Sequence, residues 1–231
     1  MADELISLTG TATIPIFPLP LVLMPYEMLP LHIFEERYRE MLIDIASSNN
    51  VFGINYFEGD SQIERPDERS IGCAAQVRQI ETLDDGRSNV VTLGVTRYRI
   101  IEYVDRGKPY NEAEIAYFVD DAENEVDVET AADDVYRLFQ RIAEAAFKMS
   151  GSRGQLPELV RGDPEQLSFL VGAGFNFENA IKLEMLAMTS TLERLAKLDK
   201  ILSKMVDQIE ESADIHAVSK TNGHSKKKID L

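Results

Sequence analysis

The sequence predicts an α+β protein with a β-rich first half and a helical second half. From residue 14 to residue 119, short apolar and alternating runs are separated by turn residues, which is typical of strands. From residue 131 the apolar residues recur at three- and four-residue steps, which is typical of amphipathic helices. We therefore expect these segments: a flexible leader at 1–13, a β-rich subdomain at 14–120, an acidic linker at 121–130, a helical subdomain at 131–213 and a disordered tail at 214–231.

Composition and charge restrict the classes of partner. The chain has 231 residues, 44% of them hydrophobic, as expected for a globular protein of one ordinary domain or two small ones. A net charge of -16 disfavours binding to nucleic acid and to an anionic membrane surface. The single cysteine, Cys73, cannot form an internal disulfide, which favours a cytoplasmic location. Its apolar neighbours predict a buried core residue rather than a nucleophile.

The most unusual stretch is residues 14–34, which is apolar but contains five prolines. Its length is close to the roughly 20 apolar residues that span a bilayer. However, each proline inside a helix costs about 3 kcal/mol, so a membrane helix is not expected. A signal peptide is not expected either, because Asp3 and Glu4 stand where a basic region belongs. The prolines instead predict short, kinked strands at the edge of a sheet.

The next elements follow from periodicity and turn chemistry. A helix is expected over 35–48, with an apolar stripe formed by Phe34, Tyr38, Met41, Leu42 and Ile45. A strand is expected over 51–57. Residues 71–83 and 89–103 should pair as a hairpin around the Asp84–Arg87 turn. A register change in the second strand predicts a bulge near 94–97, and 113–119 reads as one more strand.

The acidic stretch between the two halves has two interpretations. No basic residue stands between Lys108 and Arg137, and the acids are densest at 120–129. A calcium loop would need alternating aspartates followed by a glycine, and that pattern is missing. We therefore interpret the stretch as a solvated linker.

Helix boundaries in the second half are marked by capping residues. The first helix should end at the Gly151–Gly154 loop, and Asp163 should cap the next one. Asn176 should begin a short helix ending at Met188, and Ser190 should open the last helix. In that helix the apolar residues form a stripe with an a/d-like spacing, which comprises Leu195, Leu198, Leu202, Met205 and Ile209. We expect this stripe to pack on the other helices, with a homodimer through the last helix as the alternative.

Two motifs give a family resemblance. The first comprises Phe17-Pro18-Leu19, Pro25, Leu29-Pro30-Leu31, Ile33-Phe34-Glu35 and Arg37–Met41. The second comprises Gly94, Arg97, Arg99 and Ile100. Both resemble the Lon N-terminal (LON substrate-binding) domain, and the resemblance covers about residues 14–211. It implies a small PUA-like β-barrel with an inserted helix, followed by a C-terminal helical bundle.

The sequence also departs from the family pattern at three places. Tyr26-Glu27 stands where a Gly-Met turn is common, His32 where arginine is common, and Glu36 where proline is common. These departures concern ligand preference rather than the fold.

No catalytic motif is recognisable. The chain lacks a G-x-x-x-x-G-K-[ST] loop, a His-Glu-x-x-His pair and a cysteine pair, so we expect no enzyme, no cofactor and no metal site. Gly151-Ser152-Arg153-Gly154 follows a helix rather than a strand, unlike a nucleophile turn. A hydrolase with an unrecognised site, and a small-ligand or RNA-binding PUA-like domain, remain the alternatives to a binding module.

The resemblance implies a polypeptide-binding module, an adaptor or regulator in proteolysis or protein quality control. Its expected partners are unfolded or degron-bearing polypeptides and a Lon-type or other ATP-dependent protease. Met24, Tyr26 and Met28 alternate onto one face of the proline-rich strand and are the candidate contacts, with core packing as the alternative. His32 is a further candidate, although a hydrogen-bonded structural histidine is the simpler interpretation. Gly174–Phe177 is a weaker candidate.

Overall fold

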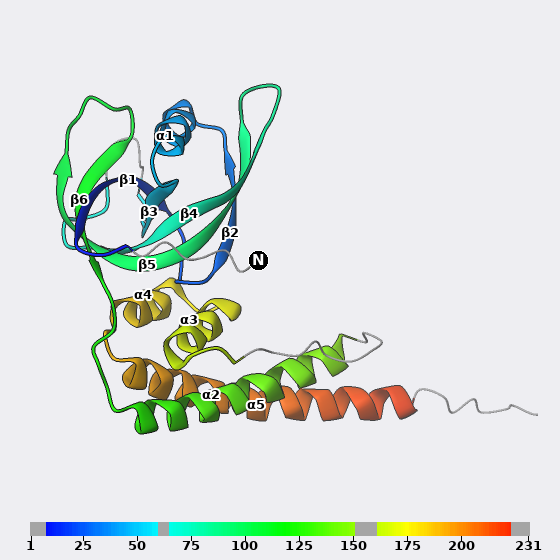
Figure 1. Cartoon of the computed structure of the whole chain (residues 1–231). Helices are drawn as coiled ribbons and strands as arrows, with labels where there is room; N and C mark the ends of the chain where they lie inside the picture. The colour runs from blue at the N-terminus through cyan, green and yellow to red at the C-terminus, as the bar shows by residue number, and fades with distance from the viewer. Residues whose placement is uncertain (1–7, 60–64, 151–160, 223–231) are drawn as a thin grey trace, which may run out of the picture. The chain divides into compact units, whose positions relative to one another are not determined.

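The computed structural model describes residues 8–59, 65–150 and 161–222 (Figure 1). Its contacts divide the chain into two compact units. Unit 1 comprises Met1–Ala122 and Phe169–Ser190, and unit 2 comprises Glu123–Ser168 and Thr191–Leu231. The predicted helical subdomain at 131–213 is therefore divided, since residues 169–190 belong with the sheet.

Unit 1 contains a six-stranded sheet in the order β2-β5-β4-β3-β1-β6. Its strands are β1 (Thr11–Leu19), β2 (Met28–Ile33), β3 (Val51–Tyr56), β4 (Ile71–Thr82), β5 (Ser88–Val104) and β6 (Asn111–Phe118). Neighbouring strands are antiparallel except β1 and β3, which are parallel. The long strand β5 pairs with β2 through its first part and with β6 through its second. The β5–β6 pairing closes a ring of five strands, and β2 lies outside that ring.

The predicted hairpin is confirmed in detail. In the turn between β4 and β5, the Leu83 N–H donates to Arg87 O at 2.8 Å, and Gly86 adopts a φ of 82°. The predicted bulge is also confirmed, because Ala74 pairs with Thr96 while Ala75 pairs with Gly94, leaving Val95 unpaired. A second register shift lies between Val77 and Gln79.

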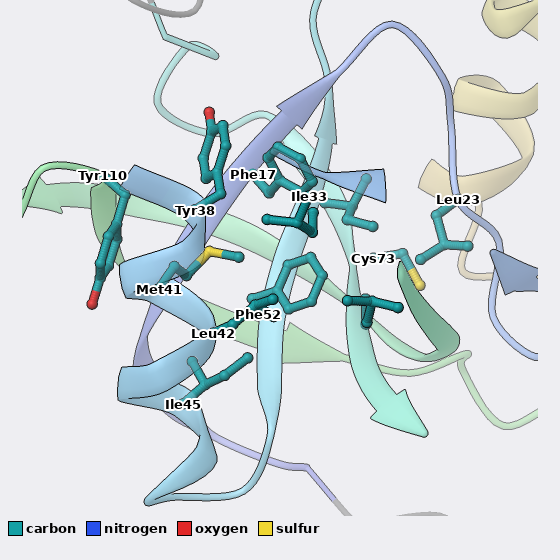
Figure 2. Close-up of a cluster of buried hydrophobic side chains, with 13 residues drawn as sticks. Phe17, Leu23, Ile33, Tyr38, Met41, Leu42, Ile45, Phe52, Cys73 and Tyr110 are labelled. Carbon is teal, nitrogen blue, oxygen red and sulfur yellow. The ribbon is translucent and has the colours of Figure 1, made fainter. Parts of the chain in front are cut away.

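The main core of unit 1 lies between the sheet and α1 (Glu36–Ala46), as Figure 2 shows. The Phe17 ring packs against Tyr38 at a centroid distance of 4.2 Å and against Phe52 at 5.9 Å. Met41, Leu42 and Ile45 from the predicted helical stripe are also buried here. Phe34 is not, because it precedes the helix and is 61% exposed, so its predicted place in the stripe is wrong.

Cys73 occupies the same core and is fully buried, as predicted. Burial raises the pKa of its thiol well above the usual range, because an apolar environment disfavours the charged thiolate. The neutral thiol is a packing residue rather than a nucleophile.

Arg97 connects β5 to the end of α4 (Asn179–Ala187) inside unit 1. Its guanidinium is 1% exposed and donates to Asp120 Oδ1 at 2.5 Å, to Leu186 O at 3.2 Å and to Met188 O. It also lies 4.6 Å from the centre of the Phe118 ring. A buried guanidinium that makes several directed bonds holds backbone segments distant in sequence in one arrangement.

The first helix of unit 2 ends where predicted but begins earlier. Helix α2 (Glu125–Met149) starts inside the predicted acidic linker, because Asn124 accepts hydrogen bonds from the N–H groups of Val126 and Asp127 at 3.0 and 3.3 Å. Acids in its first turn are favoured by the helix dipole. The acidic run is therefore partly a helix start, and the linker is shorter than predicted.

Strand β1 likewise begins at Thr11 within the predicted leader, because it pairs with β6 from that residue. At the other end, α5 (Thr191–Asn222) continues into the predicted tail.

Helix α3 (Pro164–Gly174) starts as predicted, with Asp163 Oδ1 accepting from the Gln166 N–H at 2.9 Å. Helix α4 begins at Asn179 rather than near Asn176. Phe177 N–H donates to Phe175 O at 2.8 Å, and the stacked rings of these two residues accompany a tight turn instead of a helix. The Gly151–Gly154 loop lies outside the described residues.

Helices α2 and α5 pack side by side (Figure 1). Leu195, Leu198 and Leu202 of the predicted stripe are fully buried, so this part of the stripe packs within the chain. No helix in the described ranges combines the length and apolar composition that a membrane span needs.

Candidate functional site

Strand β2 presents a row of exposed side chains. Its burial alternates, so that Leu29, Leu31 and Ile33 face inward while Met28, Pro30 and His32 are exposed. Met28 is 54% exposed, and Phe34 continues the row just beyond the strand. The rings of His32 and Phe34 stack with their centroids 6.2 Å apart. We call Met28, Pro30, His32 and Phe34 the outer row.

The outer row borders a shallow groove on the face that β2 shares with β5 and β4. His32 pairs with Asn89, which pairs in turn with Glu81. His32 Nδ1 lies 2.8 Å from Asn89 Oδ1, and Asn89 Nδ2 donates to Glu81 Oε2 at 3.2 Å. The groove has a volume of about 330 Å³ and also takes in Val91. His32 thus makes the hydrogen bond expected of a structural histidine while it remains exposed.

Met24 does not lie on this surface. Its side chain is fully buried, so it cannot contact a ligand from solution. The predicted alternation of Met24, Tyr26 and Met28 fails because β2 begins only at Met28. Met24 and Tyr26 belong instead to a turn, and Met24 anchors that turn in the core.

Tyr26 is held in a strained turn. The Glu27 N–H donates to Met24 O at 3.2 Å, which closes a four-residue turn with Pro25 in its second position. Tyr26, in the third position, has a φ of 66° and is partly exposed. This geometry is that of a type II turn, in which glycine normally occupies the third position. Tyr26 N–H donates to Gly94 O at 2.8 Å, and Glu27 Oε2 accepts from Met24 N–H at 2.9 Å.

The strain at Tyr26 gives a testable prediction. Tyr26→Gly and Tyr26→Ala both remove the aromatic side chain, but only the alanine variant keeps a Cβ in the left-handed region. We expect the glycine variant to be the more stable of the two by about 1 kcal/mol. Urea denaturation followed by circular dichroism measures the difference. Equal stability, or a more stable alanine variant, would contradict the assignment of strain.

A second groove lies between α1 and the hairpin. It has a volume of about 580 Å³ and is lined by Leu42, Ile43, Ala46 and Ile80, with Glu36, Arg39 and Glu40 among its polar residues. Ile43 is 73% exposed and Ile80 is 42% exposed. This surface was not predicted from the sequence. The one sequence feature that points to it is Ile43, an apolar residue that lies outside the apolar stripe of α1.

Comparison with known proteins identifies the family. The family model for the ATP-dependent protease La (LON) substrate-binding domain matches residues 13–204. The chain belongs to the Lon substrate-binding domain family. This confirms the resemblance found in the two sequence motifs. The match takes in helices α1 to α4 and the sheet except the first two residues of β1.

Relatives and solved structures agree with this assignment. The Lon protease of Azorhizobium caulinodans is 26% identical over 205 residues, covering 85% of this chain and 23% of the relative. That of Desulfatibacillum aliphaticivorans is 23% identical over 206 residues, covering 85% and 24%. This Lon-family chain therefore spans about a quarter of the length of these relatives.

The fold is that of Lon N-terminal domains. The N-terminal domain of Mycobacterium avium complex Lon protease superposes with a TM-score of 0.62 at 19% identity, covering 83% of this chain and 98% of that one. The Lon N-terminal domain protein from Xanthomonas campestris gives 0.59 at 17% identity, covering 81% and 96%. The predicted α+β class is confirmed.

Proposed function

We propose that this chain is a non-catalytic polypeptide-binding module that acts as an adaptor or regulator in proteolysis or protein quality control. Membership of a substrate-binding domain family supports this proposal. The proposal includes unfolded or degron-bearing polypeptides as ligands and an ATP-dependent protease as a partner. It also includes a cytoplasmic location, and the closed ring of five strands as a PUA-like β-barrel.

The outer row is the observation that carries the proposal. Met28 and Phe34 place two large apolar side chains in solvent, 54% and 61% exposed, at either end of one short strand and its extension. Clustered exposed apolar side chains mark interaction sites. Methionine adapts to ligands of different shape because its side chain is unbranched and polarizable. The groove beside the row adds polar partners from His32, Asn89 and Glu81.

Binding to an unfolded protein tests the proposal. Fluorescence anisotropy would compare labelled α-lactalbumin in its reduced, carboxymethylated form with the native form. We expect selective binding to the unfolded form. The double variant Met28→Ser/Phe34→Ser should weaken that binding about tenfold or more, since tenfold corresponds to about 1.4 kcal/mol of lost apolar contact.

A matched control distinguishes binding at the outer row from non-specific binding by exposed apolar side chains. Ile43→Ser also removes an exposed apolar side chain of unit 1, but from α1 rather than from the outer row. It should change the affinity less than twofold. Equal affinity for native and unfolded α-lactalbumin would refute the proposed function. An equal loss in the control and the double variant would refute the outer row as the binding surface.

A further inference from the structure

We infer that a bound polypeptide adds to β2 as an extra strand and hydrogen-bonds to the free edge of that strand. This inference rests on the proposed function and specifies how the ligand is held. Among the described strands, β2 pairs with β5 alone, so its second edge has no strand partner. An extended polypeptide is the ligand whose backbone matches such an edge.

The hydrogen bonds of the hairpin show which backbone groups of β5 face β2. Leu83 N–H donates to Arg87 O. Hydrogen-bonded pairs recur at every second residue of an antiparallel ladder. Glu81–Asn89 and Gln79–Val91 are therefore hydrogen-bonded pairs, so Asn89 and Val91 direct their backbone groups toward β4.

The intervening residues of β5, which include Val90 and Thr92, direct their backbone groups toward β2. Their register partners there are Leu31 and Leu29. The bond from Gly94 N–H to Glu27 O, at 2.9 Å, fits the same alternation at the other end of the strand.

It follows that Met28, Pro30 and His32 direct their backbone groups away from β5. The free edge therefore offers the N–H and C=O groups of Met28 and His32 and the C=O of Pro30. Proline has no N–H group, and Pro30 occupies a position where that donor would face the edge rather than β5. The missing N–H of Pro30 therefore removes no hydrogen bond from the ladder between β2 and β5.

This edge has little protection against pairing. Exposed edges are usually blunted by charged side chains, especially lysine, or by proline. The strand Met28–Ile33 contains no charged residue, and Pro30 is its one protecting feature. Three members of the outer row, Met28, Pro30 and His32, are also the residues whose backbone groups face the edge. A strand added here would run beside Met28 and Phe34, and its main chain would be recognised irrespective of sequence.

Backbone-methylated peptides test the pairing directly. The probe is the short α-lactalbumin peptide that binds best among overlapping segments, synthesised with N-methyl groups on alternate amides in two complementary sets. Only one edge of an added strand faces β2. One set should therefore lose at least tenfold in affinity, and the other should lose less than threefold. Equal losses for the two sets would overturn strand addition.

A substitution in the edge supplies the reciprocal test. Pro30→Val adds a backbone donor to the free edge and should tighten peptide binding roughly three- to tenfold, the effect of one hydrogen bond. Pro20→Val is the matched control, because Pro20 is an exposed proline outside β2 and should leave the affinity unchanged. Unchanged affinity in a folded Pro30→Val variant would overturn the inference.

Two further outcomes separate the inference from its premise. If the wild-type chain fails to discriminate unfolded from native α-lactalbumin, the proposed function fails and the inference fails with it. If discrimination holds and the methylated sets are equivalent, only strand addition fails. Sedimentation velocity tests whether a second copy of the chain occupies the edge instead. If Pro30→Val strengthens self-association without tightening peptide binding, the edge binds that second copy and the inference is overturned.

Discussion

Arg97→Met should destabilise the chain by about 3–5 kcal/mol, because it leaves a buried carboxylate without its cation. The side chains of Arg97 and Asp120 are 1% and 7% exposed, so solvent cannot replace the lost partner. The Leu186 and Met188 carbonyls also lose their donor. Urea denaturation, followed by circular dichroism and by tyrosine fluorescence, measures the change in the free energy of unfolding.

The second partner provides the control for this prediction. In Arg97→Met/Asp120→Asn the buried negative charge is absent as well, so the double variant should recover at least 1 kcal/mol relative to Arg97→Met. Arg97→Lys keeps the charge but cannot reproduce the planar, multiply donating guanidinium, and should fall between the wild type and Arg97→Met. A double variant no more stable than Arg97→Met would show that the charge pair is not the source of the effect.

Local signals explain the parts of the fold that the sequence predicted. The Asp84–Arg87 turn, the alternation on either side of it and the register change near Gly94 depend on residues close together in the chain. The same is true of the Asp163 cap and of the α1 stripe after Phe34. Such features can be read from one sequence because turn geometry and periodicity act over a few residues.

The features that were missed depend on where a segment packs. Phe34 and Tyr38 have helical spacing, but only Tyr38 lies after the helix has begun. Met24 and Met28 have strand spacing, but an intervening turn sends Met24 into the core. Asn124 caps α2, but the acidic run around it is equally compatible with a solvated linker, so the start of the helix could not be located from the sequence. The prolines correctly predicted an edge position for β2, but not that β1, which is also rich in proline, lies inside the sheet; that difference follows from the order of six strands, which no local pattern encodes.

Gly53→Ala should cost about 2–3 kcal/mol, because an added methyl group would overlap the buried ring of Tyr98. An ideal Cβ at Gly53 would lie 2.6 Å from Tyr98 Cζ, and the same distance separates Cζ from a Cβ at Gly72. Tyr98 is fully buried and donates a hydrogen bond to Asn55, so its ring cannot easily move aside.

A double-mutant cycle isolates this packing between Tyr98 and the glycine backbone. In a Tyr98→Leu background the overlapping ring atoms are gone, so Gly53→Ala should cost at least 1 kcal/mol less than it does in the wild type. Gly174→Ala is the matched control, since an ideal Cβ there meets nothing within 4 Å, and it should change stability by no more than about 0.5 kcal/mol. Denaturation in urea measures the free energies of unfolding of the four members of the cycle and of the control. An unchanged cost in the Tyr98→Leu background would show that the tyrosine ring does not impose glycine at residue 53. A reduced cost would mean that one buried aromatic residue of β5 selects glycine at residue 53 of β3, a strand with which β5 does not pair.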